Sequence, residues 1–225
     1  MAQPMRKILV EFFYDTVSPY SYIAFQVINR CNKSWTNMDL KLKPAFLPAV
    51  MQQTNNAPPA MVPARGRYMS HDLLRMADFY KVPFKMPRNI SDVMMNKGTI
   101  SAQRLLTVVA TEAPQYLEGL SREIFMRVWV RDEDVTMVES LKDACRAVGM
   151  GHEVDQLVGK MAHTDVKDEL RRVTQEAIDY GSFGMPTFVA HLTNEPTMLF
   201  GSDRLFLLAY YLKQSWPCDV TEAKL

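Results

Sequence analysis

The sequence has few cysteines, and none of them stands in a reactive arrangement. Among its 225 residues are three cysteines, Cys31, Cys145 and Cys218, which form neither a Cys-x-x-Cys pair nor a pair at metal-ligand spacing. So sparse and odd a set excludes a disulfide-rich secreted scaffold, and we expect free thiols in core or surface positions. The four histidines lack ligand spacing as well, so the sequence predicts no metal site.

An excess of charge of one sign and a long apolar run are also missing. Twenty-six basic and 25 acidic side chains leave a formal charge of +1, which is too little to gather nucleic acid or an anionic membrane. No apolar run approaches the roughly 20 residues that a bilayer requires. Hydrophobic residues make up an ordinary 48%. We expect a soluble globular protein of one large domain, or of one domain that carries an insertion.

Hydrophobic patterning predicts strands at both ends of the chain and helices between them. Strands at 7–15 and 39–46 flank a helix at 19–30, and strands at 187–191 and 197–201 precede a helix that begins at Ser202. The middle is helical, with helices predicted at 69–80, 101–113, 120–130, 140–149 and 164–181. The predicted fold is α/β: a thioredoxin-like domain (1–66 and 182–225), ordered β-α-β and β-β-α, interrupted by an all-helical insertion (67–181).

Local signals set the expected boundaries. Residues 47–66 contain several prolines and an Asn-Asn pair, so a long loop is predicted there. Thr136 and Glu139 have the spacing of a capping box, and Gly149 stands where a helix ends. Thr164 is expected to cap a helix that buries one face. The members of that face are Val166, Leu170, Val173 and Ala177.

Ser18 and Ser21 occupy both sulfur positions of a layout that resembles the redox loop of thioredoxin-fold proteins. The stretch FFYDTVSPYSYIAF (12–25) runs from a strand through a turn into a helix, whose N-terminus favours an anion. A serine hydroxyl stays protonated, but it can donate a charge-assisted hydrogen bond to a thiolate that a ligand brings. Such a bond and the helix end together lower a thiol pKa from about 8.5 by about one to three units. The alternative for Ser18 is a plain N-cap before Pro19, and Ser21 is more often structural.

Three further segments carry candidate binding residues. Met185-Pro186 stands directly before a predicted strand, either as a cis-proline facing the active-site loop or as an ordinary strand-entry proline. Ser202 and Asp203 begin the last helix, either as caps or as partners for a ligand carboxylate and ammonium. The loop at 47–66 adds polar side chains, which either contact a ligand or form a solvated turn. They are Asn55, Asn56 and Arg65.

With these residues in place, the chain resembles a kappa-class glutathione transferase over nearly its full length. The resemblance is carried by VEFFYDTVSPYSYIAF, MVPARGRYM, MRVWVRDEDVT, YGSFGMPTFVAH and MLFGSDR. It implies that Ser18 is the catalytic hydroxyl and that the Met185 backbone binds the cysteinyl part of glutathione like an added strand. The implied glutathione-binding residues are Ser18, Pro19, Tyr20, Asn56 (Asn55 if the register slips), Arg65, Met185, Pro186, Ser202 and Asp203. Arg65 stands where the relatives usually have lysine, which leaves its contact with the glycine carboxylate less certain.

The resemblance also implies a mechanism and partners. Glutathione is the co-substrate, its ionised sulfur is conjugated to a small electrophile, and no metal is needed; conjugation and hydroperoxide reduction remain open. Family members are homodimers. Two alternatives remain: a glutathione-dependent isomerase of aromatic carboxylates, and a non-catalytic thioredoxin-fold binding or chaperone module. A dithiol oxidoreductase is disfavoured because serines replace both sulfurs.

The last three residues predict a cellular address. Ala223-Lys224-Leu225 fits the small-basic-leucine pattern of a peroxisomal signal, so we expect the peroxisome and an import receptor as a partner. The mitochondrion is the second choice, because relatives occur there.

Overall fold

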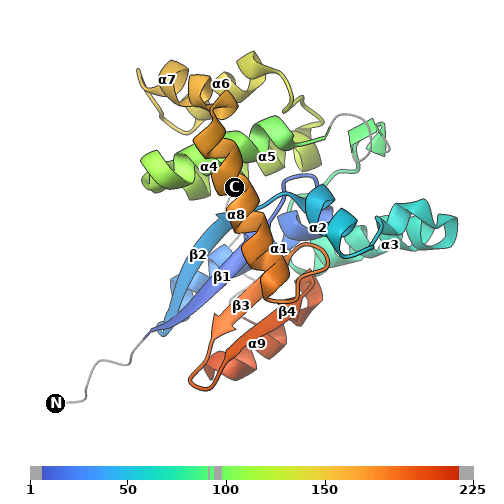
Figure 1. The fold of residues 1–225 in the computed structure, drawn as a ribbon. Helices are drawn as coiled ribbons and strands as arrows, with labels where there is room; N and C mark the ends of the chain where they lie inside the picture. Colours follow the sequence, from blue (N-terminus) through green and yellow to red (C-terminus); the bar gives the residue numbers. More distant parts are fainter. Residues whose placement is uncertain (1–6, 91, 94–97, 218–225) are drawn as a thin grey trace.

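The protein is built around a four-stranded mixed sheet. The computed structural model describes residues 7–90, 92–93 and 98–217. The sheet has the order β2-β1-β3-β4 (Figure 1). Its strands are β1 (Ile8–Tyr14), β2 (Met38–Pro44), β3 (Thr187–His191) and β4 (Pro196–Phe200). β2 runs parallel to β1, whereas β3 is antiparallel to both β1 and β4. All four predicted strands are confirmed to within a few residues.

β1 lies in the middle of the sheet because nearly every side chain of ILVEFFY finds cover. Phe12 and Tyr14 face one way, into a cluster with side chains of α1 (Pro19–Ser34) and of the helices inserted after β2. Phe13 faces the other way, into a second cluster with side chains of α2 (Leu47–Gln53) and α8 (Thr164–Asp179), such as Val50 and Val173. The C-terminal end of β1, where the predicted active-site loop begins, is thus covered by helices on both faces.

Helices make up most of the described chain outside the sheet, and the greater number of them lie between β2 and β3. Those of the described residues are α1 (Pro19–Ser34), α2 (Leu47–Gln53), α3 (Pro63–Phe79), α4 (Ile100–Glu112), α5 (Leu117–Met126), α6 (Val138–Ala147), α7 (Val154–Gly159), α8 (Thr164–Asp179) and α9 (Leu205–Leu212). Short 3₁₀ segments lie at Pro59–Met61, Pro114–Tyr116, Lys160–Ala162 and Ser202–Arg204, and a π-helical turn at Arg127–Arg131 continues α5. In Figure 1, α4 to α7 gather beyond one end of the sheet, and α8 runs back from them across it. None of the helices in the described ranges has the length and apolar character needed to cross a bilayer.

The long loop predicted at 47–66 is wrong. Most of the segment is helical, because Pro48 and Pro63 stand in the first turns of α2 and α3, where proline has no hydrogen bond to lose. Only the short stretch around Asn55 and Asn56 turns without helix, and Asn55 adopts a positive φ of 53° there. The predicted domain boundary at residue 66 falls inside α3, and the division into domains stays a prediction.

Several predicted caps are also wrong, although the helices exist. Met137, not Thr136, precedes α6, and the Asp134 carboxylate accepts hydrogen bonds from the Thr136 and Met137 amides (both 2.8 Å). Thr164 is the first residue of α8 and not its cap. The Ser202–Arg204 turn likewise has no side-chain cap. Gly149 is confirmed as a helix-terminating glycine by its φ of 84°.

The expectation of free thiols is only partly met. Cys145 is a free, buried thiol, whereas Cys31 is disulfide-bonded, so the prediction for Cys31 is wrong. Cys218 and the Ala223-Lys224-Leu225 tripeptide lie outside the described residues, so peroxisomal import stays a prediction.

Candidate active site

Ser18 holds the N-terminus of α1 and faces the loop before β3. Its Oγ accepts a hydrogen bond from the Ser21 amide at 3.1 Å, which makes it the N-cap, and donates one to the Met185 carbonyl at 3.1 Å. Pro19 follows at the first helical position, and the side chain of Ser18 is largely buried. The predicted N-cap is therefore confirmed, whereas the catalytic role of Ser18 stays a prediction.

Asp15 fixes the loop that carries Ser18. Its carbonyl accepts from the Ser18 amide (3.0 Å), and its fully buried carboxylate accepts from the Val17 amide (3.0 Å), the Leu47 amide (2.9 Å) and the Thr99 hydroxyl (2.6 Å). Burial raises the pKa of this carboxyl to about 6 despite those hydrogen bonds. Asp15 thus ties the loop to α2 and to the segment before α4. Sequence reasoning used Asp15 only to end a strand; a charged residue at the end of a buried strand was the signal.

Two buried side chains of the helical segment hold the neighbouring backbone. The Gln103 amide group donates to the Tyr14 carbonyl (3.1 Å) and the Ala45 carbonyl (2.7 Å), and its oxygen accepts from the Thr16 hydroxyl (3.2 Å). The Trp129 indole donates to the Thr16 carbonyl at 2.9 Å. The helical segment therefore positions the loop directly. Sequence reasoning missed both side chains, because nothing in their local pattern distinguishes them from ordinary helical residues.

The segment before β3 presents backbone groups to the same place. The Met185-Pro186 peptide bond is cis, which settles a question that the sequence left open. The Pro186 carbonyl accepts from the Gly201 amide at 3.0 Å, which joins this segment to β4 and the turn that follows it. Gly201 has a φ of 97°, a conformation that favours glycine, and the turn places Ser202 and Asp203 beside Pro186 at the rim of one cavity.

Asn56 and Arg65 line the same cavity from the α2–α3 region. The Asn56 side-chain amide donates to the Phe183 carbonyl at 2.7 Å, so it bridges the turn after α2 to the segment before β3. Arg65 is an exposed residue in the first turns of α3. Asp203 is exposed and forms an ion pair with Arg204.

All nine predicted site residues line a single open cavity of about 1040 Å³. Its other walls come from α2 and α3, with Met51 and Met76 among the apolar members and Asp72 among the charged ones. The Tyr20 hydroxyl donates to the Asp72 carboxylate at 2.9 Å, and burial together with that carboxylate raises the Tyr20 pKa. Tyr20 therefore stays protonated, and it lines the cavity as a hydrogen-bond donor to Asp72.

Comparison with known proteins decides the family. The chain is 42% identical to glutathione S-transferase kappa 1 of Rattus norvegicus over 209 residues, which is 92% of each chain. It is likewise 42% identical to glutathione S-transferase kappa 1 of Homo sapiens over 92% of each chain. The chain belongs to the kappa class of glutathione transferases.

The wider relationships of this kappa-class enzyme agree with its fold. Residues 9–213 match the DSBA-like thioredoxin domain family. A 2-hydroxychromene-2-carboxylate isomerase of Pseudomonas sp. (strain C18) is 27% identical over 89% of this chain and 88% of its own. A solved 2-hydroxychromene-2-carboxylate isomerase superposes with a TM-score of 0.75 at 22% identity, over 91% of this chain and 94% of that chain. The thioredoxin-like fold with an inserted helical segment, predicted from the sequence, is confirmed.

Proposed function

We propose that this kappa-class enzyme binds glutathione in the 1040 Å³ cavity and conjugates its sulfur to electrophiles, with the Ser18 hydroxyl stabilising the thiolate. The observation that carries the proposal is the position of Ser18. Its Oγ lies at the N-terminus of the 16-residue helix α1, next to the backbone of Met185, inside the cavity shared by every candidate residue. A hydroxyl and a helix end both favour a negative charge at that point.

The charged and polar walls suit an extended tripeptide. The Met185 backbone offers an edge on which a peptide adds as a strand, and Ser202 and Asp203 lie at one side of that edge to hold the γ-glutamyl end. Asn56 and Arg65 lie at the cavity wall formed by the α2–α3 region and are assigned to the glycine end. Arg65 retains the cationic charge that a carboxylate requires.

Ser18 has one hydroxyl proton, which it donates to the Met185 carbonyl. When glutathione binds along this edge, the Ser18 hydroxyl turns from the carbonyl to the sulfur, because a thiolate is the stronger, charged acceptor. The thiol proton leaves to solvent, and the thiolate receives the Ser18 hydrogen bond. The sulfur then attacks the electrophilic carbon of an aryl halide, the C–S bond forms, and halide departs. Rate enhancement comes from alignment and thiolate stabilisation.

Titration of the bound thiol tests this role of Ser18. The Ser18→Ala variant removes the hydrogen bond, so we expect the pKa of bound glutathione, followed by thiolate ultraviolet absorbance, to rise by about one unit or more. Turnover falls sharply with it. Ser21→Ala is the matched control, because the buried Ser21 Oγ has no hydrogen-bond partner among the described residues. A titration curve identical in wild type and Ser18→Ala would count against the proposal.

A glutathione-dependent isomerase is the second candidate, supported by the isomerase relatives. Such an enzyme uses the thiolate as a transient nucleophile and returns it unchanged. Assays with 1-chloro-2,4-dinitrobenzene separate the two, because only conjugation consumes glutathione in proportion to product. Glutathione that stays constant while an aromatic carboxylate is isomerised would favour the isomerase.

A further inference from the structure

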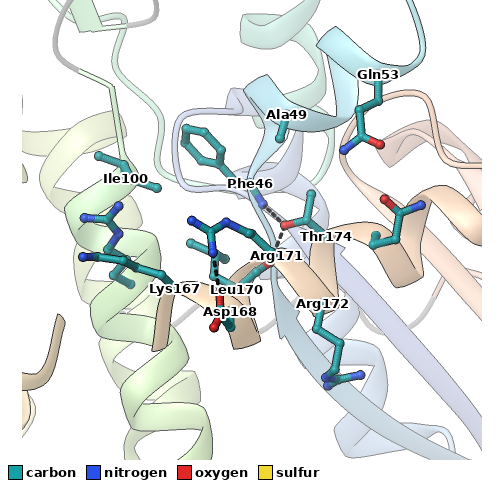
Figure 2. A pocket seen from close by; sticks show the side chains of 12 residues that line it. Phe46, Ala49, Gln53, Ile100, Lys167, Asp168, Leu170, Arg171, Arg172 and Thr174 are labelled. Atoms are coloured by element: carbon teal, nitrogen blue, oxygen red, sulfur yellow. Dashed lines mark hydrogen bonds and ion pairs between the residues drawn. The ribbon is translucent and has the colours of Figure 1, made fainter. Parts of the chain in front are cut away.

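A second cavity lies on the opposite face of α2 from the proposed glutathione cavity. Its volume is about 550 Å³, within the range of small-molecule sites. It is lined from α2, α4 and α8, and Figure 2 shows Phe46 and Ala49 on one side and Lys167 and Arg171 on another. Along α2, Leu47 and Met51 face the first cavity, whereas Ala49 and Gln53 face the second. The two cavities are therefore separate spaces.

The second cavity has more positive charge than its neighbours neutralise. Arg171 pairs with Asp168, and Arg172 pairs with Glu169 at 2.7 Å. Arg104 and Lys167 have no side-chain hydrogen bond or ion pair with any described residue. The Nε of Arg104 is buried without a partner, and the terminal guanidinium nitrogens, which are not buried in this way, have no acceptor among the described residues.

The same cavity has an apolar wall. Phe46, Ala49, Ile100 and Leu170 line it beside the cations. Phe46 is held in place because its amide donates to the Thr174 hydroxyl at 3.0 Å, and that hydroxyl donates to the Leu170 carbonyl at 2.6 Å, as the dashed lines in Figure 2 show. The wall is thus fixed by hydrogen bonds between α2 and α8, and does not depend on a ligand to form.

We propose that this cavity binds a monocarboxylate with an apolar chain, whose carboxylate lies between Arg104 and Lys167 and whose chain lies over Phe46 and Ile100. A carboxylate supplies an acceptor for the unpaired terminal nitrogens of Arg104, which arginine offers as parallel N–H donors. The apolar wall favours an acid with an alkyl chain over a small inorganic anion, since burial of the chain adds to the charge interaction. This site is independent of the proposed catalytic function.

Calorimetric titration with three probes tests the ligand class. Decanoate carries charge and chain, decanol carries the chain alone, and acetate carries the charge alone. We expect saturable binding of decanoate to the full-length protein, and affinities at least about tenfold weaker for decanol and acetate. Equal binding of decanoate and decanol would overturn the proposal, and so would the absence of decanoate binding.

Variants place the ligand. Arg104→Gln should weaken decanoate binding about tenfold or more, because the charge-assisted hydrogen bonds are lost. Lys167→Gln, which removes the second unpaired cation of the cavity, should weaken it in the same direction. The matched control is Arg146→Gln, which removes an exposed arginine on α6, outside the cavity, and should leave binding unchanged. Circular dichroism checks that the variants fold.

S-hexylglutathione separates the two cavities. Occupying the larger cavity with this thioether should not displace decanoate, since α2 stands between the sites. Full displacement, or decanoate affinity unchanged in both Arg104→Gln and Lys167→Gln, would place decanoate in the larger cavity and overturn the proposal.

Discussion

At the scale of single residues, the predicted active-site loop contains one serine hydroxyl that has hydrogen-bond partners and one that has none among the described residues. The Ser18 hydroxyl accepts one hydrogen bond and donates another. The Ser21 hydroxyl, one turn into α1, is wholly buried and has no partner among the described residues. The loop of this chain thus holds two serines with very different surroundings.

Ser21→Ala should stabilise the protein. The substitution removes a buried, unpaired hydroxyl and introduces a better helix former, so we expect the free energy of unfolding to rise by about 1–2 kcal/mol. Urea denaturation measures it, with Ser140→Ala as the contrast, because the Ser140 hydroxyl donates to the Asp134 carbonyl and its loss should destabilise. A less stable Ser21→Ala protein would mean that the hydroxyl has a partner in solution.

Asp15 should make stability depend on pH. Its pKa rises from an ordinary value of 3.8 to about 6 in the folded protein, so the folded state binds this proton more tightly than the unfolded chain. The resulting stabilisation is complete below about pH 4 and is lost as the pH rises through about 6. Relative to Asp15→Asn, which does not titrate, the wild type should lose about 3 kcal/mol of unfolding free energy across that window. Parallel urea curves at each pH measure the difference; a constant difference would contradict the assigned pKa.

The residues that the sequence predicted for the site line one cavity, but the sequence did not predict the residues that hold the Ser18 loop in place. Ser18 and Asp203 lie where a strand gives way to a helical segment, Met185 lies just before a strand, and such places are recognisable locally. Gln103 and Trp129 act on backbone groups of residues 14–16 from far along the chain. A buried amide that satisfies two carbonyls looks, in sequence, like any polar residue on a helix, and only the tertiary fold reveals its partners.

At the scale of elements, α2 is the segment that the sequence misjudged and the segment that the two cavities share. The prolines of residues 47–66 resembled loop residues, yet Pro48 stands at the start of α2 and Pro63 at the start of α3. The helix has no side-chain cap of its own at Phe46. Instead, the Phe46 amide donates to Thr174 of α8 at 3.0 Å and the Leu47 amide to Asp15 at 2.9 Å. Tertiary contacts therefore replace the local signal that the prediction sought.

Thr174→Val tests this tertiary cap. Valine keeps the shape but leaves the Phe46 amide without its acceptor, so we expect a loss of about 1–2 kcal/mol in unfolding free energy. Thr107→Val is the matched control: Thr107 is also buried and donates to the carbonyl four residues earlier, but bonds to no second element among the described residues. Equal losses in the two variants would show that the helix-internal bond, and not the Phe46 contact, carries the effect.

At the scale of the whole molecule, the predicted thioredoxin-like part and the predicted helical insertion share one apolar core. The larger cluster runs without a break from Phe12 of β1 through Phe25 of α1 to Phe125 of α5 and Trp129. The Phe25 and Phe125 rings lie 5.3 Å apart, and the Tyr14 hydroxyl hydrogen-bonds the Ser121 hydroxyl at 2.6 Å. The contact between the two parts is thus a core contact, and not the loose interface of two independent domains.

Unfolding should accordingly be one cooperative transition. Trp35 reports on the thioredoxin-like part and Trp129 on the helical part, and both indoles are buried. In two variants that keep only one of these tryptophans (Trp35→Phe with Trp216→Phe, and Trp129→Phe with Trp216→Phe), fluorescence and far-ultraviolet circular dichroism should give urea midpoints that coincide within each protein. Phe125→Ala removes a large side chain from the centre of the shared core. It should lower the free energy of unfolding by about 3–5 kcal/mol and shift the urea midpoints of both single-tryptophan variants downward together. Separate midpoints for Trp35 and Trp129 would instead mean that the helical part melts on its own, and that the hydrogen bonds from Gln103 and Trp129 do not unite the two parts.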